Sequence, residues 1–308
     1  MKIVLLDADT LGDCDLSEIA ACGEFVSYGA TSMQECVERC AGADIVLTNK
    51  VVLDEKILAA LPDLKLICIT ATGMNNVDLA YAKKRGIEVK NVAGYSTTAV
   101  AQHTMSMALH LLARLGYYDS YCKSGAWCES EVFVHLNGGL IELENLEWGI
   151  IGFGSIGQRV GNLAQAFGAK VSYYSTSGKN TQEGFKRKEL DEILAHSDII
   201  SIHAPLNPQT QNLINRHNLS LLKDEAIVIN VGRGGIVNEL DMAECLKTRH
   251  IYFGTDVLES EPMKPNHVFL DPAIADKLLI TPHVAWAYDK ARERLLELTL
   301  ANIKAFLG

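Results

Sequence analysis

The sequence predicts an α/β fold built from two doubly wound parallel sheets. Short apolar runs alternate with amphipathic helical segments from one end of the chain to the other, which is the pattern of repeated βαβ units. The chain has 308 residues, more than one hydrophobic core usually organises, so two domains are expected. Hydrophobic residues make up 48% of the chain and charged residues 21%, which excludes a disordered or membrane-embedded composition.

The first third of the chain predicts one small doubly wound domain. Its apolar runs have the length of buried strands, and the segments between them have helical periodicity. The candidate strands are residues 3–6, 25–27, 44–47, 64–70 and 89–92, and the candidate helices are residues 33–40 and 77–85.

The middle and the end of the chain predict a connecting helix, a second domain and a returning helix. Residues 97 to about 123 contain no proline, and apolar side chains such as Val100, Met107 and Leu111 recur at helical spacing, so one long helix is expected. Residues 288–307 predict an amphipathic helix that packs on the first domain. The candidate strands of the second domain are residues 149–153, 171–174, 199–203, 226–230 and 278–281.

Charge and cysteine usage narrow the class of protein. The formal charge of −10 disfavours nucleic acid as a partner, and the apolar run at the amino terminus is too short for a signal peptide or a membrane span. A cytoplasmic protein is therefore expected, with no membrane partner. The eight cysteines form no Cys-x-x-Cys pair. Cys36 and Cys40, four residues apart, could supply half of a metal site, but no metal is expected.

A glycine pattern between a candidate strand and a helix predicts a dinucleotide site. Gly152 permits a tight turn, Gly154 lets the backbone approach a pyrophosphate, and Gly157 lets the helix pack closely on the strand. Ser155 and Ile156 lie within this pattern, and a helical run over residues 158–167 follows it, so the free N–H groups at the helix start would face the phosphates. The alternative is a glycine-rich turn that serves packing alone.

The end of the following strand bears on the choice between NAD and NADP. An NAD site usually carries a carboxylate there for the ribose 2′-hydroxyl, but this segment has Ser175, Thr176, Ser177 and Lys179 instead. Hydroxyls and an ammonium group would tolerate a 2′-phosphate that a carboxylate repels. The pattern therefore favours NADP modestly, and a polar turn that still binds NAD is the alternative.

Three later motifs carry residues suited to reducing a 2-keto acid. Arg233, Glu261 and His283 each follow a candidate strand, where open α/β sheets place their ligands. An arginine can orient a carboxylate and polarise the adjacent carbonyl group. A histidine beside a carboxylate is a suitable proton donor for the developing alkoxide.

Further motifs at residues 71–78, 94–101 and 203–210 complete a resemblance to the D-isomer-specific 2-hydroxyacid dehydrogenases over almost the whole chain. The resemblance implies that Arg233, Glu261 and His283 form a catalytic triad. It implies substrate contacts from Thr72 and Gly73, with Lys50 and Trp286 as further candidates, and a nicotinamide carboxamide contact from Asp256. The other implied cofactor contacts are Val100, His203, Ala204, Pro205, Thr210, Val231 and Gly232.

The resemblance also implies an architecture and a branch of the family. Residues 1–97 and 286–308 would form the substrate domain and residues 98–285 a Rossmann-like cofactor domain, with the active site in the cleft between them. Residues 116–140 resemble the dimerisation region, which implies a homodimer. Trp286 and its motif resemble the glycerate dehydrogenase or hydroxypyruvate reductase branch, although residues 132–139 depart from it. The alternatives are a D-lactate or broader 2-ketoacid reductase, and a dinucleotide-binding corepressor.

Overall fold

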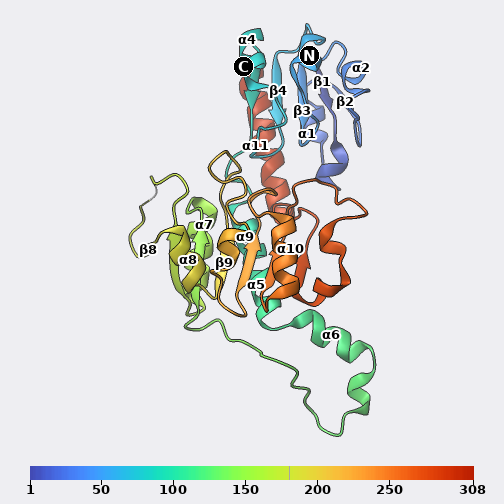
Figure 1. Cartoon of the computed structure of the whole chain (residues 1–308). Coiled ribbons are helices and arrows are strands. Elements are labelled where there is room, and N and C mark those ends of the chain that lie inside the picture. Colours follow the sequence, from blue (N-terminus) through green and yellow to red (C-terminus); the bar gives the residue numbers. More distant parts are fainter. Residues whose placement is uncertain (180) are drawn as a thin grey trace. The chain divides into compact units, whose positions relative to one another are not determined.

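The computed structural model describes residues 1–179 and 181–308, and the chain divides into two compact units (Figure 1). Unit 1 comprises Met1–Ser96 and Ala287–Gly308, and unit 2 comprises Thr97–Trp286. Each unit contains a parallel sheet with helices, so the predicted α/β class and the doubly wound sheets are confirmed.

The sheet of unit 1 has five parallel strands in the order β2-β1-β3-β4-β5. Every position of β3 and β4 is buried, because parallel strands in the middle of such a sheet are covered on both faces. The predicted strands begin and end within two residues of the observed ones, which are β1 (Lys2–Leu5), β2 (Glu24–Ser27), β3 (Ile45–Thr48), β4 (Leu66–Ile69) and β5 (Glu88–Lys90).

The carboxyl-terminal helix α11 (Asp289–Leu307) belongs to unit 1 and packs against β4. It buries Ala291, Leu295, Leu300 and Ile303 along one face, as its amphipathic pattern predicts. The helices contributed by the first part of the chain are short: η1 (Ala8–Leu11), α1 (Ser17–Ala20), α2 (Cys36–Arg39), α3 (Glu55–Ala59) and α4 (Leu79–Arg85).

The sheet of unit 2 has seven parallel strands in the order β12-β11-β10-β9-β6-β7-β8. Five of them match predicted runs: β6 (Glu147–Ile151), β7 (Lys170–Tyr174), β9 (Ile199–Ile202), β10 (Ile227–Asn230) and β12 (Leu278–Ile280). Two had no predicted range, although the motif of Glu261 was expected to follow a strand. β8 (Lys186–Arg187) is a two-residue edge strand with no apolar side chain, and β11 (Tyr252–Thr255) contains Gly254, which interrupts the apolar pattern.

The strand order gives unit 2 a topological switch point between β6 and β9. The chain passes from β6 to β7 and β8 on one side, and then returns to β9 on the other side of β6. Ligands of open α/β sheets bind at the carboxyl ends of the strands at such a point. The remaining helices of unit 2 are α7 (Ser155–Ala166), α8 (Leu190–His196), α9 (Arg216–Leu219), α10 (Glu239–Thr248), η3 (Val268–Leu270) and η4 (Pro272–Lys277).

The single long helix expected over residues 97–123 is wrong. The chain forms α5 (Thr97–Leu112) and α6 (Leu115–Lys123), and Arg114 between them has a left-handed φ of 48°. Helix α5 buries ten residues, whereas α6 buries none. The helical periodicity of the sequence continues through the break at Arg114. The buried contacts that would hold one straight helix end with α5. Arg114 instead donates to the carbonyl of Asn137 and stacks 4.7 Å from the ring centre of Tyr117.

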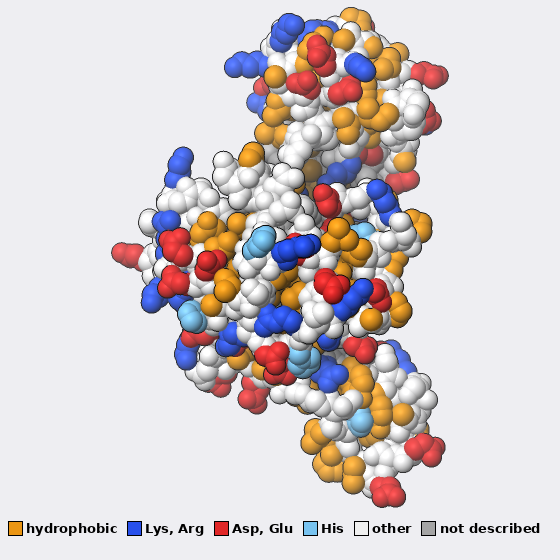
Figure 2. All heavy atoms as spheres, viewed as in Figure 1, with side chains coloured by type: hydrophobic (Ala, Val, Ile, Leu, Met, Phe, Trp, Pro, Cys, Tyr) orange, Lys and Arg blue, Asp and Glu red, His pale blue; other side chains and the backbone are white. Residues whose placement is uncertain are grey.

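Residues 115–140, here called the arm, extend from the rest of unit 2 as α6, η2 (Ala126–Glu129) and an irregular loop segment (Figure 1). Hydrophobic side chains gather on this arm, at the lower right of Figure 2. At least half of the surface of each of six large apolar side chains is exposed: Leu115, Trp127, Val132, Phe133, Leu136 and Leu140. Such a concentration of exposed apolar surface is characteristic of an interaction surface.

Among the helices that the structure describes, none combines the length and the apolar composition that crossing a bilayer requires.

Replacing Leu295 with alanine tests whether α11 is an integral part of unit 1. Leu295 is fully buried, so we expect Leu295→Ala to lower the free energy of unfolding by about 2–5 kcal/mol, through lost transfer energy and a cavity. Urea titration followed by circular dichroism measures the change. Leu307→Ala, in the last turn of the same helix and 38% exposed, is the matched control. Equal losses from both variants would contradict the packing described.

Candidate active site

The glycine loop after β6 has the steric properties that a dinucleotide requires. Gly152 has a φ of +89°, and a Cβ there would lie 2.7 Å from the backbone nitrogen of Ala204. A Cβ on Gly157 would overlap the carbonyl of Gly152, so helix α7 could not approach the strand. A Cβ on Gly154 would meet nothing within 4 Å, which leaves this backbone open to a ligand. The three glycines thus meet the three requirements that the sequence predicted for them.

The amino terminus of α7 also suits an anionic group. Gly154 is the N-cap residue and provides no side-chain cap, and the first turn, which includes Ser155 and Ile156, has no acidic residue. The first N–H groups of a helix have no intrahelical acceptor, and the helix dipole favours negative charge there. A pyrophosphate is the dinucleotide group that this end of the helix fits.

The loops after β9 and β10 lie beside the glycine loop. Ala204 contacts the Gly152 turn on one side, and a Cβ on Gly232 would lie 3.0 Å from the carbonyl oxygen of Ala204 on the other. Thr210 fastens the β9 loop, since its hydroxyl donates to the carbonyl of Pro205 over 2.6 Å. His203 is enclosed, and burial lowers its pKa to about 3. The structure therefore brings three predicted cofactor segments together at the switch point.

The predicted 2′-phosphate segment follows β7. Ser175 is buried, Thr176 is partly buried, and Ser177 and Lys179 are exposed. Asn180, the next residue, lies outside the described residues. Sequence reasoning missed Arg187, which belongs to β8 and donates to the carbonyl oxygen of Gly178 over 3.0 Å. In the sheet, Arg187 of β8 pairs with Tyr173 of β7, and this neighbourhood becomes visible only in the structure.

Arg233 lies in a turn that is stabilised by Asn230 at the end of β10. The amide of Asn230 donates to the carbonyl of Arg233 over 2.9 Å and accepts from the N–H of Gly232 over 3.1 Å. A Cβ on Gly234 would overlap the backbone at Leu258, so this turn packs directly against the segment after β11. The same segment carries Glu261, whose carboxylate accepts from the N–H of Leu258 over 2.9 Å.

Glu261 and His283 form the closest predicted catalytic pair. The Nδ1 atom of His283 lies 2.7 Å from Oε2 of Glu261, and the two side chains are 22% and 33% exposed, respectively. His283 has a φ of 55°, an uncommon conformation for a residue other than glycine. Its backbone N–H donates to the carbonyl of Asp256 over 2.8 Å. With Nδ1 engaged by the carboxylate, Nε2 is the ring atom available for proton transfer.

Asp256 organises the loop that carries His283. Its buried carboxylate accepts from the N–H groups of Val284 and Ala285, over 2.8 and 2.9 Å, and from the hydroxyl of Thr281 over 2.6 Å. The contact of Asp256 with a nicotinamide carboxamide remains a prediction. Thr281 and His103, whose Nε2 atom lies 3.0 Å from the Thr281 hydroxyl oxygen, were not among the predicted site residues, although Thr281 lies in the same motif as His283.

The predicted substrate residues of unit 1 lie on loops after β3 and β4. Lys50 and Thr72 are exposed, and the hydroxyl of Thr72 donates to the carbonyl of Val92 over 2.9 Å. Sequence reasoning missed Asp7, a buried residue after β1 that accepts from the backbone N–H of Asn49 and of Lys50. The carboxylate of Asp7 thus holds the loop of Lys50 in place. That loop follows β3, and Thr72 and Gly73 follow the neighbouring strand β4.

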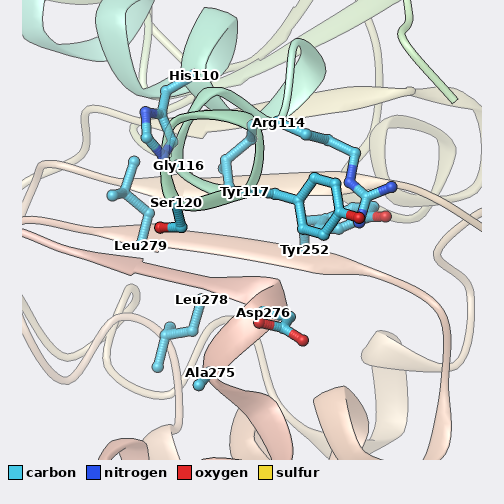
Figure 3. Close-up of a pocket in the computed structure, with 11 residues that line it drawn as sticks. His110, Arg114, Gly116, Tyr117, Ser120, Tyr252, Ala275, Asp276, Leu278 and Leu279 are labelled. Atoms are coloured by element: carbon cyan, nitrogen blue, oxygen red, sulfur yellow. The ribbon is translucent and has the colours of Figure 1, made fainter. Parts of the chain in front are cut away.

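The remaining predicted residues belong to unit 2. Val100 on α5 and Val231 after β10 are buried in the same hydrophobic cluster, and Trp286 packs partly buried against that cluster. A cavity of about 280 Å³ also lies in unit 2, between the root of the arm and β11 and β12 (Figure 3). It is lined by residues such as His110, Arg114, Tyr252 and Asp276 and by none of the predicted site residues.

Comparison with known proteins identifies the family. The sequence profile of the "D-isomer specific 2-hydroxyacid dehydrogenase, NAD binding domain" matches residues 105–285. The chain is 36% identical to a hydroxypyruvate reductase of Blautia hydrogenotrophica, over 100% of this chain and 97% of the relative. It is 35% identical to a glycerate dehydrogenase of Methylorubrum extorquens, over 100% and 96%.

Among solved structures, a D-lactate dehydrogenase from Aquifex aeolicus, complexed with NAD and lactic acid, superimposes with a TM-score of 0.86. It is 29% identical to this chain and matches 100% of this chain and 95% of its own length. The sequence motifs, the two parallel sheets and the glycine loop at the switch point agree with these matches. The chain belongs to the D-isomer specific 2-hydroxyacid dehydrogenase family, and is therefore an oxidoreductase that uses a nicotinamide dinucleotide.

Proposed function

We propose that this chain reduces hydroxypyruvate and glyoxylate to D-glycerate and glycolate. The observation that carries the proposal is the contact of 2.7 Å between His283 and Glu261. These residues follow β12 and β11, and Arg233 follows the next strand of the same sheet, β10. A 2-keto acid needs a cation for its carboxylate and carbonyl oxygen and an acid for the alkoxide that forms. The bound dinucleotide supplies the hydride.

Each residue of the proposed triad has a separate task. Arg233 orients the substrate carboxylate and polarises the carbonyl group through its planar fork of N–H donors. His283 donates a proton from Nε2 to the carbonyl oxygen as the hydride arrives. Glu261 holds the ring through Nδ1 and stabilises the protonated imidazole. Lys50, Thr72, Gly73 and Trp286 are the proposed substrate contacts.

The choice of substrate is supported by the relatives named hydroxypyruvate reductase and glycerate dehydrogenase, which match along the whole chain. A D-lactate dehydrogenase is the alternative, because the Aquifex aeolicus structure holds lactic acid and shares the fold. Hydroxypyruvate differs from pyruvate, the keto acid of a D-lactate dehydrogenase, by a hydroxyl group on the third carbon. A site with a polar partner for that hydroxyl group can discriminate strongly between the two substrates.

For the cofactor we propose a modest preference for NADP over NAD. The segment after β7 has hydroxyl groups and Lys179 where a carboxylate would repel a 2′-phosphate. Arg187 adds a second cation beside the same segment. NAD bound through other contacts is the alternative.

We also propose a cytoplasmic homodimer. The arm exposes large apolar side chains that a second copy of the chain would cover, and a two-fold pair of such arms forms a closed assembly. All eight cysteines are free thiols, as in proteins of a reducing compartment. Unit 1 is the proposed substrate domain and unit 2 the proposed dinucleotide domain.

A steady-state assay with hydroxypyruvate, glyoxylate and pyruvate tests the substrate. We expect kcat/KM for hydroxypyruvate to exceed that for pyruvate by at least about tenfold, the net contribution of about one hydrogen bond to the extra hydroxyl group. Each substrate is measured with NADH and with NADPH. A preference for pyruvate would support the D-lactate alternative instead.

The Glu261→Gln variant tests the proposed proton donor. His283 must carry the proton that reaches the substrate oxygen, and the Glu261 carboxylate lies 2.7 Å from its Nδ1 atom. Glutamine keeps the size of the side chain but removes the charge that orients and stabilises the ring as a proton donor. We expect kcat/KM for reduction, measured at one pH, to fall about tenfold.

The matched control is Glu259→Gln, which removes an exposed carboxylate two residues away and should leave kcat/KM unchanged. An unchanged kcat/KM in a folded Glu261→Gln variant would mean that Glu261 has another task.

Arg187→Ala tests the cofactor preference. If Arg187 binds the 2′-phosphate, its removal should raise the Kd of NADPH about three- to tenfold, the scale of one solvent-accessible hydrogen bond to a charged group. The Kd of NADH should not change. Lys186→Ala is the control, because neighbouring residues of a strand point to opposite faces. Fluorescence titration measures both constants, and equal effects on the two cofactors would refute the assignment.

A further inference from the structure

His103 on α5 is a buried histidine that the proposed mechanism does not use. Its Nε2 atom lies 3.0 Å from the hydroxyl oxygen of Thr281 and 3.8 Å from Oδ1 of Asp256. All three residues belong to unit 2, although 178 positions separate His103 from Thr281 in the sequence. Burying an imidazole and a carboxylate costs free energy unless hydrogen bonds replace their hydration, so their hydrogen-bond partners are the next question.

The hydrogen-bond directions in this group follow from its donors and acceptors. A carboxylate only accepts, so the hydroxyl hydrogen of Thr281 points to Asp256 over 2.6 Å. The Thr281 oxygen must then accept from His103, which places the ring hydrogen on Nε2. Burial holds the pKa of His103 below its usual value, and Asp256 acts in the opposite direction. His103 is therefore a neutral donor at the start of a relay of oriented hydrogen bonds.

The relay ends at the backbone of the loop that carries His283. Asp256 accepts from the N–H groups of the two residues after His283, and its own carbonyl accepts from the N–H of His283. The relay therefore fixes the backbone on one side of a residue held at a φ of 55°. A residue in this conformation persists only when its surroundings determine it.

We propose that His103 is a positioning residue for His283, acting through Thr281 and Asp256 to hold the His283 ring in its orientation for proton transfer. The inference rests on the proposed role of His283 as the acid. His103 does not touch the reacting atoms, and both carboxylate oxygens of Asp256 accept from the loop after His283, so the main effect of His103 falls on the geometry of the acid. Loss of its N–H should therefore lower kcat and leave binding constants nearly unchanged.

The test compares His103→Leu with His103→Gln in the full chain, using the 2-keto acid that the wild type reduces best. Leucine removes the donor, whereas the glutamine amide can present an N–H at a reach similar to that of Nε2. We expect leucine to lower kcat about 10- to 100-fold, the range for groups that orient a reactive residue, and glutamine to recover most of it. The KM and the cofactor Kd should stay within about threefold.

Thr281→Val removes the middle of the relay and provides a second route if His103→Leu fails to fold. It should reproduce the loss in kcat, and combining it with His103→Leu should add little, because both changes break one connection. Ser106→Ala, on the exposed side of α5, is the control and should match the wild type.

Three results would overturn the proposal. The first is a folded His103→Leu or Thr281→Val variant with kcat within about threefold of wild type, and the second is losses that multiply in the double variant. The third is a loss in KM or cofactor affinity instead of kcat, which would mean that His103 supports ligand binding or packing and not the acid. His283→Ala separates the two proposals. If that variant remains active, the acid is another group, whereas an inactive His283→Ala beside a normal His103→Leu refutes the relay alone.

Discussion

The buried carboxylate of Asp256 is the interaction on which the candidate active site depends. Removing a charge from water is costly unless donors replace the lost hydration, and here a hydroxyl and two backbone N–H groups replace it. Those donors come from the segment after β12, so satisfying the charge also shapes that segment. His283, with its φ of 55° and its contact with Glu261, lies within that segment, and its own N–H donates to the carbonyl of Asp256.

Close backbone approach is the second constraint, and it acts on three neighbouring loops at the switch point. Gly152 and Gly232 both lie against Ala204, so the loops after β6, β9 and β10 come nearer to one another than side chains would allow. Among the glycines of these three loops, Gly154 is the one whose added Cβ would meet nothing within 4 Å. The glycines are therefore not equivalent: two hold the protein's own loops together, and one leaves room for the dinucleotide.

The arm illustrates a different balance. Helix α5 is held by ten buried residues, whereas α6 buries none and continues the chain in a new direction after Arg114. Stacking of Arg114 on Tyr117 and of His135 on Tyr121, at 3.8 Å between ring centres, holds the arm together in place of a core. The apolar surface that remains exposed is the basis for the proposed homodimer.

The sequence by itself determined the α/β class, most strands of both sheets and the glycine loop, because strand burial and turn sterics are local properties that leave a repeating pattern. It also singled out Glu261 and His283 as candidates, and the structure places these two side chains in contact, while their catalytic role stays a prediction. It did not predict β8 and β11, whose pairing depends on neighbouring strands rather than on their own residues. Only the tertiary structure showed the break at Arg114, the contact of Asp7 with the loop of Lys50, and the relay from His103 to Asp256. Each of these depends on side chains far apart in the sequence, or on packing that is absent where periodicity predicts it, and no local pattern records such contacts.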